Sequence, residues 1–130
     1  MAPLATRADG LPAHKVALVL SDYYTMPGLD KLERQLALDP LTADFSFIRF
    51  LGNRKQMDSL IAKKKEEGKA REFDEIVVDR TPEMRRWIPA IRRLAPRASA
   101  IYAYFNNHYA GFGPGSAALF ASLWRELGES

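Results

Sequence analysis

Three stretches of the chain have the apolar pattern of buried strands. Lys15–Asp22 contains a continuous apolar run, Val16–Leu20, and ends in an acidic side chain, and Ile101–Phe105 is an apolar and aromatic run. Phe45–Gly52 is also apolar but carries Arg49 among its phenylalanines. Continuous apolar runs of this length are typical of strands that are buried on both faces of a parallel sheet.

Each predicted strand is followed by a segment with helical spacing of its apolar residues. The clearest of these begins at Thr81 and ends before Pro96. It has one apolar stripe, formed by Met84, Trp87, Ile88, Ile91 and Leu94. The other predicted helices are Leu29–Leu38, Asn53–Glu67 and Ser116–Leu127. Phe73–Asp79 is a further candidate strand, with an extended lead into the next helix as the alternative.

This order of elements predicts an α/β fold of about three parallel βα units, with helices packed on the sheet. Residues 1–13 lack apolar periodicity, so we expect a flexible N-terminal arm followed by a single domain over 14–130. Three parallel strands cannot close a barrel and leave two bare edges. We therefore expect a second copy of the chain or a complementing chain to cover them.

Composition narrows the class of protein without identifying a reaction. The hydrophobic share of 47% and the charged share of 27% are ordinary for a globular domain, and the absence of cysteine excludes disulfides and thiolate metal sites. No apolar run is long enough to span a membrane, and the first ten residues lack the apolar core of a signal peptide, so a cytoplasmic protein is expected. The net charge of +3 permits binding to phosphate or nucleic acid but does not establish it.

Polar side chains lie at the end of every predicted strand. They are Asp22 at the end of the first, Arg49 and Arg54 on either side of Gly52 around the end of the second, and Asn106, Asn107 and His108 after the third. Because the carboxyl ends of parallel strands meet at one edge, this pattern predicts a site there. In that site His108 is the candidate acid or base, Asn107 orients it, and Asp22 is a further catalytic candidate.

The glycine-rich loop after the third strand suggests where a phosphate would bind. Gly111, Gly113 and Gly115 precede a predicted helix that begins near Ser116, and helix N-termini attract anions. The predicted ligand-binding residues are Arg49, Arg54, Asn106, Tyr109, Gly113, Gly115 and Ser116. The expected ligand is a phosphate-containing small molecule or a nucleic acid, and no cofactor or metal is predicted.

Each of these side chains also has a structural alternative. Asp22 can cap a turn, Arg49 can pair with a neighbouring carboxylate, and the asparagines and His108 can order the loop by hydrogen bonds. The glycines can simply form a tight turn. A metal site would need carboxylates such as Asp22, because His14 and His108 are the only histidines.

Three segments resemble the YecE-like family, domain of unknown function 72. They are Leu41–Arg54 (LTADFSFIRFLGNR), Val78–Thr81 (VDRT) and above all Tyr104–Gly111 (YFNNHYAG), and the similarity extends over about Lys15–Leu127. The resemblance implies a partial TIM-barrel-like fold, in which this chain matches the C-terminal portion of a domain about twice its length. The family has no established reaction, so the resemblance implies a fold and a site rather than an activity.

Two classes of function follow from these observations. The first is a ligand-binding or hydrolase-type site at the carboxyl ends of the strands, with metal-assisted hydrolysis as a variant. The second is a non-catalytic fragment or interaction module that needs a partner to complete the barrel. The chain is then a truncated reading frame, a half-barrel that self-associates, or half of a split protein.

Overall fold

A computed structural model describes residues 15–34, 37, 39–68 and 73–128, so the predicted arm over 1–13 lies outside the described residues. Three strands form one sheet in the order β1-β2-β3, and both pairs are parallel. The strands are β1 (Val19–Tyr23), β2 (Phe45–Gly52) and β3 (Ala100–Phe105). The predicted α/β fold with a parallel sheet is confirmed, and it is consistent with part of a barrel.

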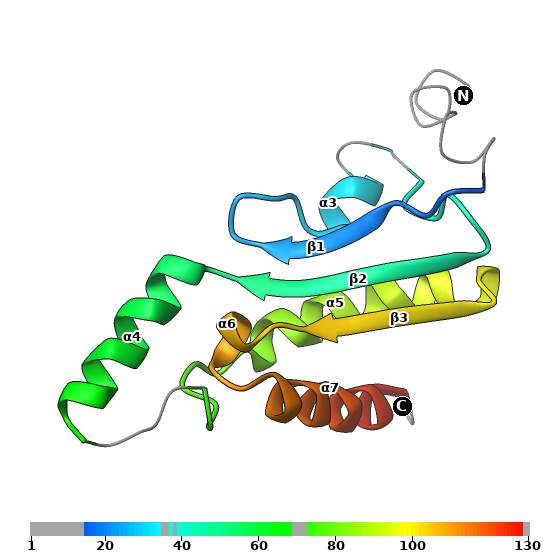
Figure 1. The fold of residues 1–130 in the computed structure, drawn as a ribbon. Helices are drawn as coiled ribbons and strands as arrows, with labels where there is room; N and C mark the ends of the chain where they lie inside the picture. Colours follow the sequence, from blue (N-terminus) through cyan, green and yellow to red (C-terminus); the bar gives the residue numbers. More distant parts are fainter. Residues whose placement is uncertain (1–14, 35–36, 38, 69–72, 129–130) are drawn as a thin grey trace.

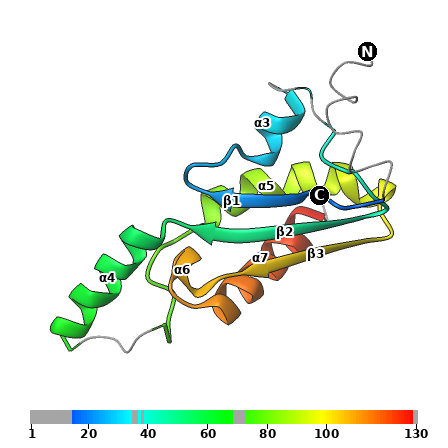
Figure 2. The same ribbon diagram turned by 45° about the horizontal axis from the view of Figure 1, so that its top comes forward.

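The described residues also form five α-helices. They are α3 (Leu29–Arg34), α4 (Arg54–Glu66), α5 (Thr81–Leu94), α6 (Asn107–Ala110) and α7 (Gly113–Gly128), with a 3-10 turn η1 (Ala95–Arg97) after α5. α5 and α7 lie against one face of the sheet, whereas α4 extends away from the carboxyl end of β2 (Figures 1 and 2). None of the helices in the described part of the chain is long and apolar enough to cross a membrane.

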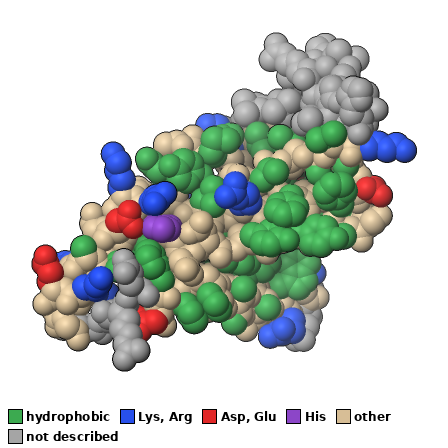
Figure 3. Space-filling model, in the orientation of Figure 1, with side chains coloured by type: hydrophobic (Ala, Val, Ile, Leu, Met, Phe, Trp, Pro, Cys, Tyr) green, Lys and Arg blue, Asp and Glu red, His purple; other side chains and the backbone are tan. Residues whose placement is uncertain are grey.

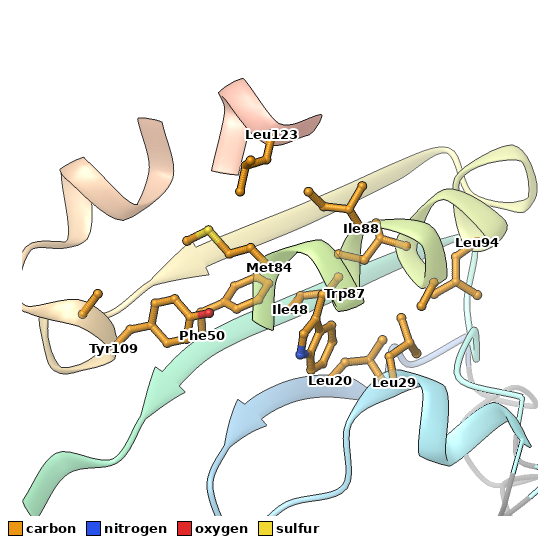
Figure 4. Close-up of a cluster of buried hydrophobic side chains, with 13 residues drawn as sticks. Leu20, Leu29, Ile48, Phe50, Met84, Trp87, Ile88, Leu94, Tyr109 and Leu123 are labelled. Atoms are coloured by element: carbon orange, nitrogen blue, oxygen red, sulfur yellow. The ribbon is translucent and has the colours of Figure 1, made fainter. Parts of the chain in front are cut away.

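The hydrophobic core lies between the sheet and α5 (Figure 4). Phe50 is completely buried at its centre, where its ring stacks on Phe105 at 4.5 Å and meets Trp87 edge-on at 5.4 Å. The stripe predicted for α5 is buried along its whole length, and Pro89 lies on the exposed side of that helix. Because proline is placed away from the core, the helix continues through it.

β1 is shorter than the sequence predicts. Its first residue is Val19 rather than Lys15, because the backbone before it is bonded to a side chain instead of a neighbouring strand. The Leu18 amide donates to Thr42 Oγ1 at 2.7 Å, and that hydroxyl donates to the Val16 carbonyl at 2.8 Å. The buried side chain of Thr42 therefore fixes the backbone immediately before β1.

The predicted strand over Phe73–Asp79 is wrong. The amides of Val77 and Val78 both donate to the carbonyl of Ala110, at 2.7 and 3.2 Å. A strand needs a ladder of successive partners, and one shared carbonyl at the end of α6 does not supply it. The structure has an irregular lead into α5 in place of a strand, with a turn and bends over residues 73–75.

The face of the sheet opposite α5 and α7 is open. Four of its large hydrophobic side chains are 36–52% exposed, namely Val19, Phe45, Tyr102 and Tyr104. Figure 3 shows hydrophobic side chains gathered over the strands on this face. We call it the open face, and the face under α5 and α7 the covered face.

Candidate functional site

The carboxyl ends of the three strands meet at one edge of the sheet, but their polar side chains divide between its two faces. Asp22 is in register with Phe50, and both belong to the covered face. Arg49 is one residue earlier on β2, so it lies on the open face, between Ser21 of β1 and Tyr104 of β3. Alternation along the strand therefore separates two residues that the sequence placed in one site.

Arg49 lines a cavity of about 340 Å³ on the open face. The cavity walls are Phe47, Arg49, Leu51, Tyr104, Phe105 and Asn106. The rings of Phe47 and Tyr104, which line the same cavity, stack at 4.6 Å and are nearly parallel. Among the described residues Arg49 has no acidic partner, so the predicted structural alternative, an ion pair, has no support in the part of the chain that is described.

His108 belongs to a second cluster, between α4 and α6. Its Nε2 lies 2.9 Å from Asp58 Oδ1, and its Nδ1 lies 3.2 Å from Asn106 Oδ1. Arg54 Nε is 3.9 Å from the other oxygen of Asp58, and the ring of Phe73 lies 4.8 Å from the imidazole. Asn106 borders both this cluster and the Arg49 cavity, so it connects the two.

The surroundings of His108 limit the chemistry that it can perform. Both ring nitrogens face oxygen acceptors, so the contacts are satisfied together when the ring carries both protons. The side chain is 22% exposed while that of Asp58 is 55% exposed, so the pair lies at the surface. A carboxylate beside an imidazole orients the ring for proton transfer. His108 can exchange a proton with a ligand once one of its two contacts opens.

Asp22 lies in a different environment, a cavity of about 230 Å³ at the carboxyl ends of β1 and β2. This cavity is lined by Asp22, Tyr24, Gly52, Asn53, Gln56, Arg80, Glu83 and Tyr109. Arg80 Nε donates to the Tyr109 carbonyl at 2.8 Å, and its Nη1 lies 3.8 Å from Glu83 Oε1. No hydrogen bond or ion pair of the described residues joins Asp22 to His108.

Burial changes the acidity of two groups in this cavity. Burial raises the pKa of Asp22 above its ordinary value, and the nearby Arg80 opposes that change only in part. Burial, together with the charge of Asp22, raises the pKa of Tyr109. The phenol and the carboxyl lie close enough to influence each other, yet neither the Tyr109 hydroxyl nor Asp22 Oδ2 has a partner at ordinary hydrogen-bond geometry.

The glycine loop predicted to bind phosphate is largely helical. α7 begins at Gly113, so Ser116 lies inside its first turn and its amide donates to the Phe112 carbonyl at 3.0 Å. The Ser116 amide is therefore not free for an anion, and its side chain is buried. Asn107 Oδ1 accepts from the Gly113 amide at 2.8 Å, which occupies that oxygen at the start of α7.

Gly113 itself has a packing reason to be glycine. A Cβ there would lie 2.7 Å from the Phe105 carbonyl oxygen, which is closer than real contacts allow. The backbone of α7 thus begins against the end of β3. Gly115 is half-buried and lies in the same first turn of α7. The predicted loop is therefore too long, because the helix begins at Gly113 and not near Ser116.

Three residues that sequence reasoning missed contribute to these clusters, Asp58, Arg80 and Glu83. Asp58 had a usable signal, because it follows Arg54 by four residues on a predicted helix and so shares its face. Arg80 lies in the Val78–Thr81 segment that carries the family resemblance, but only the packing of the start of α5 against Tyr109 brings it and Glu83 to Asp22. No group of three potential metal-ligating side chains occurs within the described residues.

Comparison with known proteins agrees with this fold. The family profile described as "Protein of unknown function DUF72" matches residues 5–130, whereas no curated protein matches the sequence. The crystal structure of a DUF72 family protein from Thermotoga maritima superposes with a TM-score of 0.53 at 21% identity. The match covers 96% of this chain and 41% of that one, so the chain spans less than half the length of this relative. The chain therefore belongs to the DUF72 family, to which the YecE-like proteins that its motifs resemble also belong.

Proposed function

We propose that the Arg49 cavity on the open face binds a phosphate-containing ligand that carries a flat ring, such as a nucleotide or a unit of single-stranded nucleic acid. The observation that carries this proposal is the position of Arg49. Its guanidinium has no acidic partner among the described residues, and Arg49 lines the same cavity as the stacked rings of Phe47 and Tyr104.

The chemistry of the cavity suits both parts of such a ligand. A guanidinium binds phosphate through two parallel hydrogen bonds, and an arginine without a carboxylate partner keeps its donors available. An exposed aromatic ring on a sheet is a platform on which a base can stack, a contact worth about 1–3 kcal/mol. Tyr104 is 52% exposed and supplies that surface. The Asn106 amide, at the end of β3, adds a polar group at the rim.

Calorimetric titration of the full chain with adenosine monophosphate tests the proposal. Arg49→Ala removes the charged hydrogen bonds and is expected to weaken binding by about tenfold to a hundredfold. Arg97→Ala is the matched control, because Arg97 is also exposed but already pairs with Asp39 at 2.7 Å. Equal affinities of the two variants, or no binding by the unaltered chain, would contradict the proposal.

A hydrolase-type reaction is a second candidate, supported by the contact between His108 and Asp58. In this proposal water attacks the phosphorus of an ester bound at Arg49, and the bond from phosphorus to the leaving oxygen breaks. His108 accepts the proton of the water or donates a proton to the leaving oxygen, and Asp58 orients the imidazole. The test is release of phosphate or of a leaving group from phosphate esters, compared between the unaltered chain and His108→Ala. Turnover that survives this substitution would exclude His108 from the reaction.

The interaction module is the alternative function, supported by the apolar open face and by the two sheet edges, with which no strand of the described residues pairs. Here a second copy or a complementing chain supplies further strands and covers Tyr102 and its neighbours. Size-exclusion chromatography with light scattering gives the oligomeric state. A discrete dimer that Tyr102→Glu dissociates supports self-association, whereas a stable monomer argues against it.

A further inference from the structure

The open face carries two exposed tyrosines at alternate positions of its edge strand, β3. Tyr102 is 49% exposed and Tyr104 is 52% exposed, and no strand of the described residues pairs with the far side of β3. Tyr104 lines the Arg49 cavity, but Tyr102 does not. A single nucleotide in that cavity therefore leaves the second exposed ring without a contact.

The two tyrosines belong to an array of four side chains on neighbouring strands. Phe47 is in register with Tyr102, and Arg49 is in register with Tyr104. The ring of Phe47 stacks on that of Tyr104 at 4.6 Å and lies 6.0 Å from that of Tyr102. Rings that already contact one another lose little freedom when a ligand stacks on them. The array is therefore a preorganised platform of three rings and one guanidinium.

The spacing of the tyrosines favours a single strand of nucleic acid over a duplex. Residues two apart on a strand are separated by about 6.6 Å, because a parallel strand rises about 3.3 Å per residue. Successive bases of a duplex are only about 3.4 Å apart along its axis and cover one another's faces. The bases of a single strand can be unstacked and offered singly to aromatic rings.

The charge of the open face also favours this ligand over a second copy of the chain. Arg49 is exposed, and it is the one charged residue among the open-face positions of β2 and β3, where the others are apolar or aromatic. The same face of a second copy would bring another Arg49 and no carboxylate, and burying an unpaired charge is costly. A phosphodiester supplies the missing negative charge, and its two bases supply flat surfaces for the rings.

We infer that the open face binds two successive nucleotides of a single-stranded nucleic acid, with one base on Tyr104, the next base on Tyr102 and the phosphodiester between them at Arg49. Stacking and a phosphate contact are the same for DNA and RNA, so the single strand and not its sugar defines the ligand. This inference rests on the proposed binding of a nucleotide phosphate at Arg49, and it adds the second base and its contact with Tyr102.

The test compares two ligands of equal charge on the ¹⁵N-labelled full chain by two-dimensional NMR. They are the dinucleotide d(ApA) and its one-base analogue, the methyl ester of adenosine monophosphate. The dinucleotide is expected to bind about fivefold to a hundredfold more tightly, because it gains a second stacked base. It is also expected to shift the amides of Tyr102 and Ala103, which the one-base analogue and a short A·T duplex leave unchanged. Equal affinities, or saturable shifts of Tyr102 with the duplex, would overturn the inference.

Variants of Tyr102 assign the second stacked base. Tyr102→Leu keeps an apolar side chain on the edge strand and is expected to weaken d(ApA) by about fivefold to a hundredfold without changing the affinity for adenosine monophosphate. Tyr102→Phe keeps the ring and is expected to bind both ligands as the unaltered chain does. Tyr24→Leu is the matched control, because Tyr24 is 58% exposed but follows the end of β1, outside the array. Equal losses in Tyr102→Leu and Tyr24→Leu would overturn the inference, and the two-ligand comparison decides it if Tyr102→Leu does not fold.

The inference and the proposed function fail in different ways. If adenosine monophosphate binds through Arg49 but d(ApA) binds no more tightly than its one-base analogue, the inference is overturned and the proposed function stands. If neither adenosine monophosphate nor d(ApA) binds, the proposed function is overturned together with the inference. A dimer that Tyr102→Glu dissociates, with no binding of d(ApA), would assign the open face to a second copy of the chain and would overturn the inference as well.

Discussion

Gly52→Ala tests how tightly the end of β2 is fitted against α6, the contact that brings the two cavities to one edge of the sheet. Gly52 has a φ of +71°, and a Cβ there would lie 2.9 Å from Tyr109 Cα and 3.1 Å from the carbonyl oxygen of His108. These are backbone atoms, so they cannot turn away as the end of a side chain can. The left-handed conformation costs alanine about 1 kcal/mol, and overpacking of this kind costs about 1–3 kcal/mol more.

We therefore expect Gly52→Ala to lower the free energy of unfolding by roughly 2–4 kcal/mol, and the midpoint of thermal unfolding by about 4 °C for each kcal/mol. Gly68→Ala is the matched control: Gly68 has a φ of +66°, but no atom of the described residues lies within 4 Å of the added Cβ. It is expected to cost about 1 kcal/mol, the price of the backbone conformation alone. Urea denaturation followed by circular dichroism measures both variants. Equal losses would refute the close fit between β2 and α6.

Three further predictions concern the polar residues. Because burial raises the pKa of Asp22 above 3.8, the folded protein binds this proton more tightly than the unfolded chain, and stability falls as pH rises from 3.8 through the higher folded value. Asp22→Asn should remove that loss, so denaturation curves should show a larger gain in stability at pH 7 than at pH 3. Asn107→Ala should cost about 1 kcal/mol in denaturation through the lost bond to the Gly113 amide, and a loss below ~0.3 kcal/mol would argue against this role. A double-mutant cycle of His108→Ala and Asp58→Ala should give a coupling of about 0.2–1 kcal/mol, as for a half-exposed pair, and no coupling would mean that their contact adds nothing to stability.

The pattern of apolar residues was sufficient to predict the sheet. Phe45–Gly52 is a strand over the predicted residues, and every residue of the predicted stripe in α5 is buried. These predictions rest on periodicity, which is a property of neighbouring residues in the chain. Phe73–Asp79 has a similar composition but not the structure, because the amides of Val77 and Val78 bond to the single carbonyl of Ala110 and not to a strand.

The composition of the site was harder to predict than its place. The sequence located the edge of the sheet at which Asp22, Arg49 and Asn106 lie, but alternation along the strands sends Asp22 and Arg49 to opposite faces. The sequence also indicated a loop where Asn106 and Asn107 form caps that start α6 and α7. Such hydrogen bonds from side chains to the backbone depend on the residue at which each helix begins. They could not be predicted because the ends of a helix are uncertain by one or two residues.

The most direct test of phosphate binding at Arg49 is to locate the site of adenosine monophosphate on the ¹⁵N-labelled chain by NMR. The structure predicts saturable shifts of the amides of Arg49, Tyr104 and Asn106 on the open face, and their loss in Arg49→Ala. Shifts confined to the first turn of α7, or the absence of any saturable shift, would contradict the proposal that Arg49 holds the phosphate.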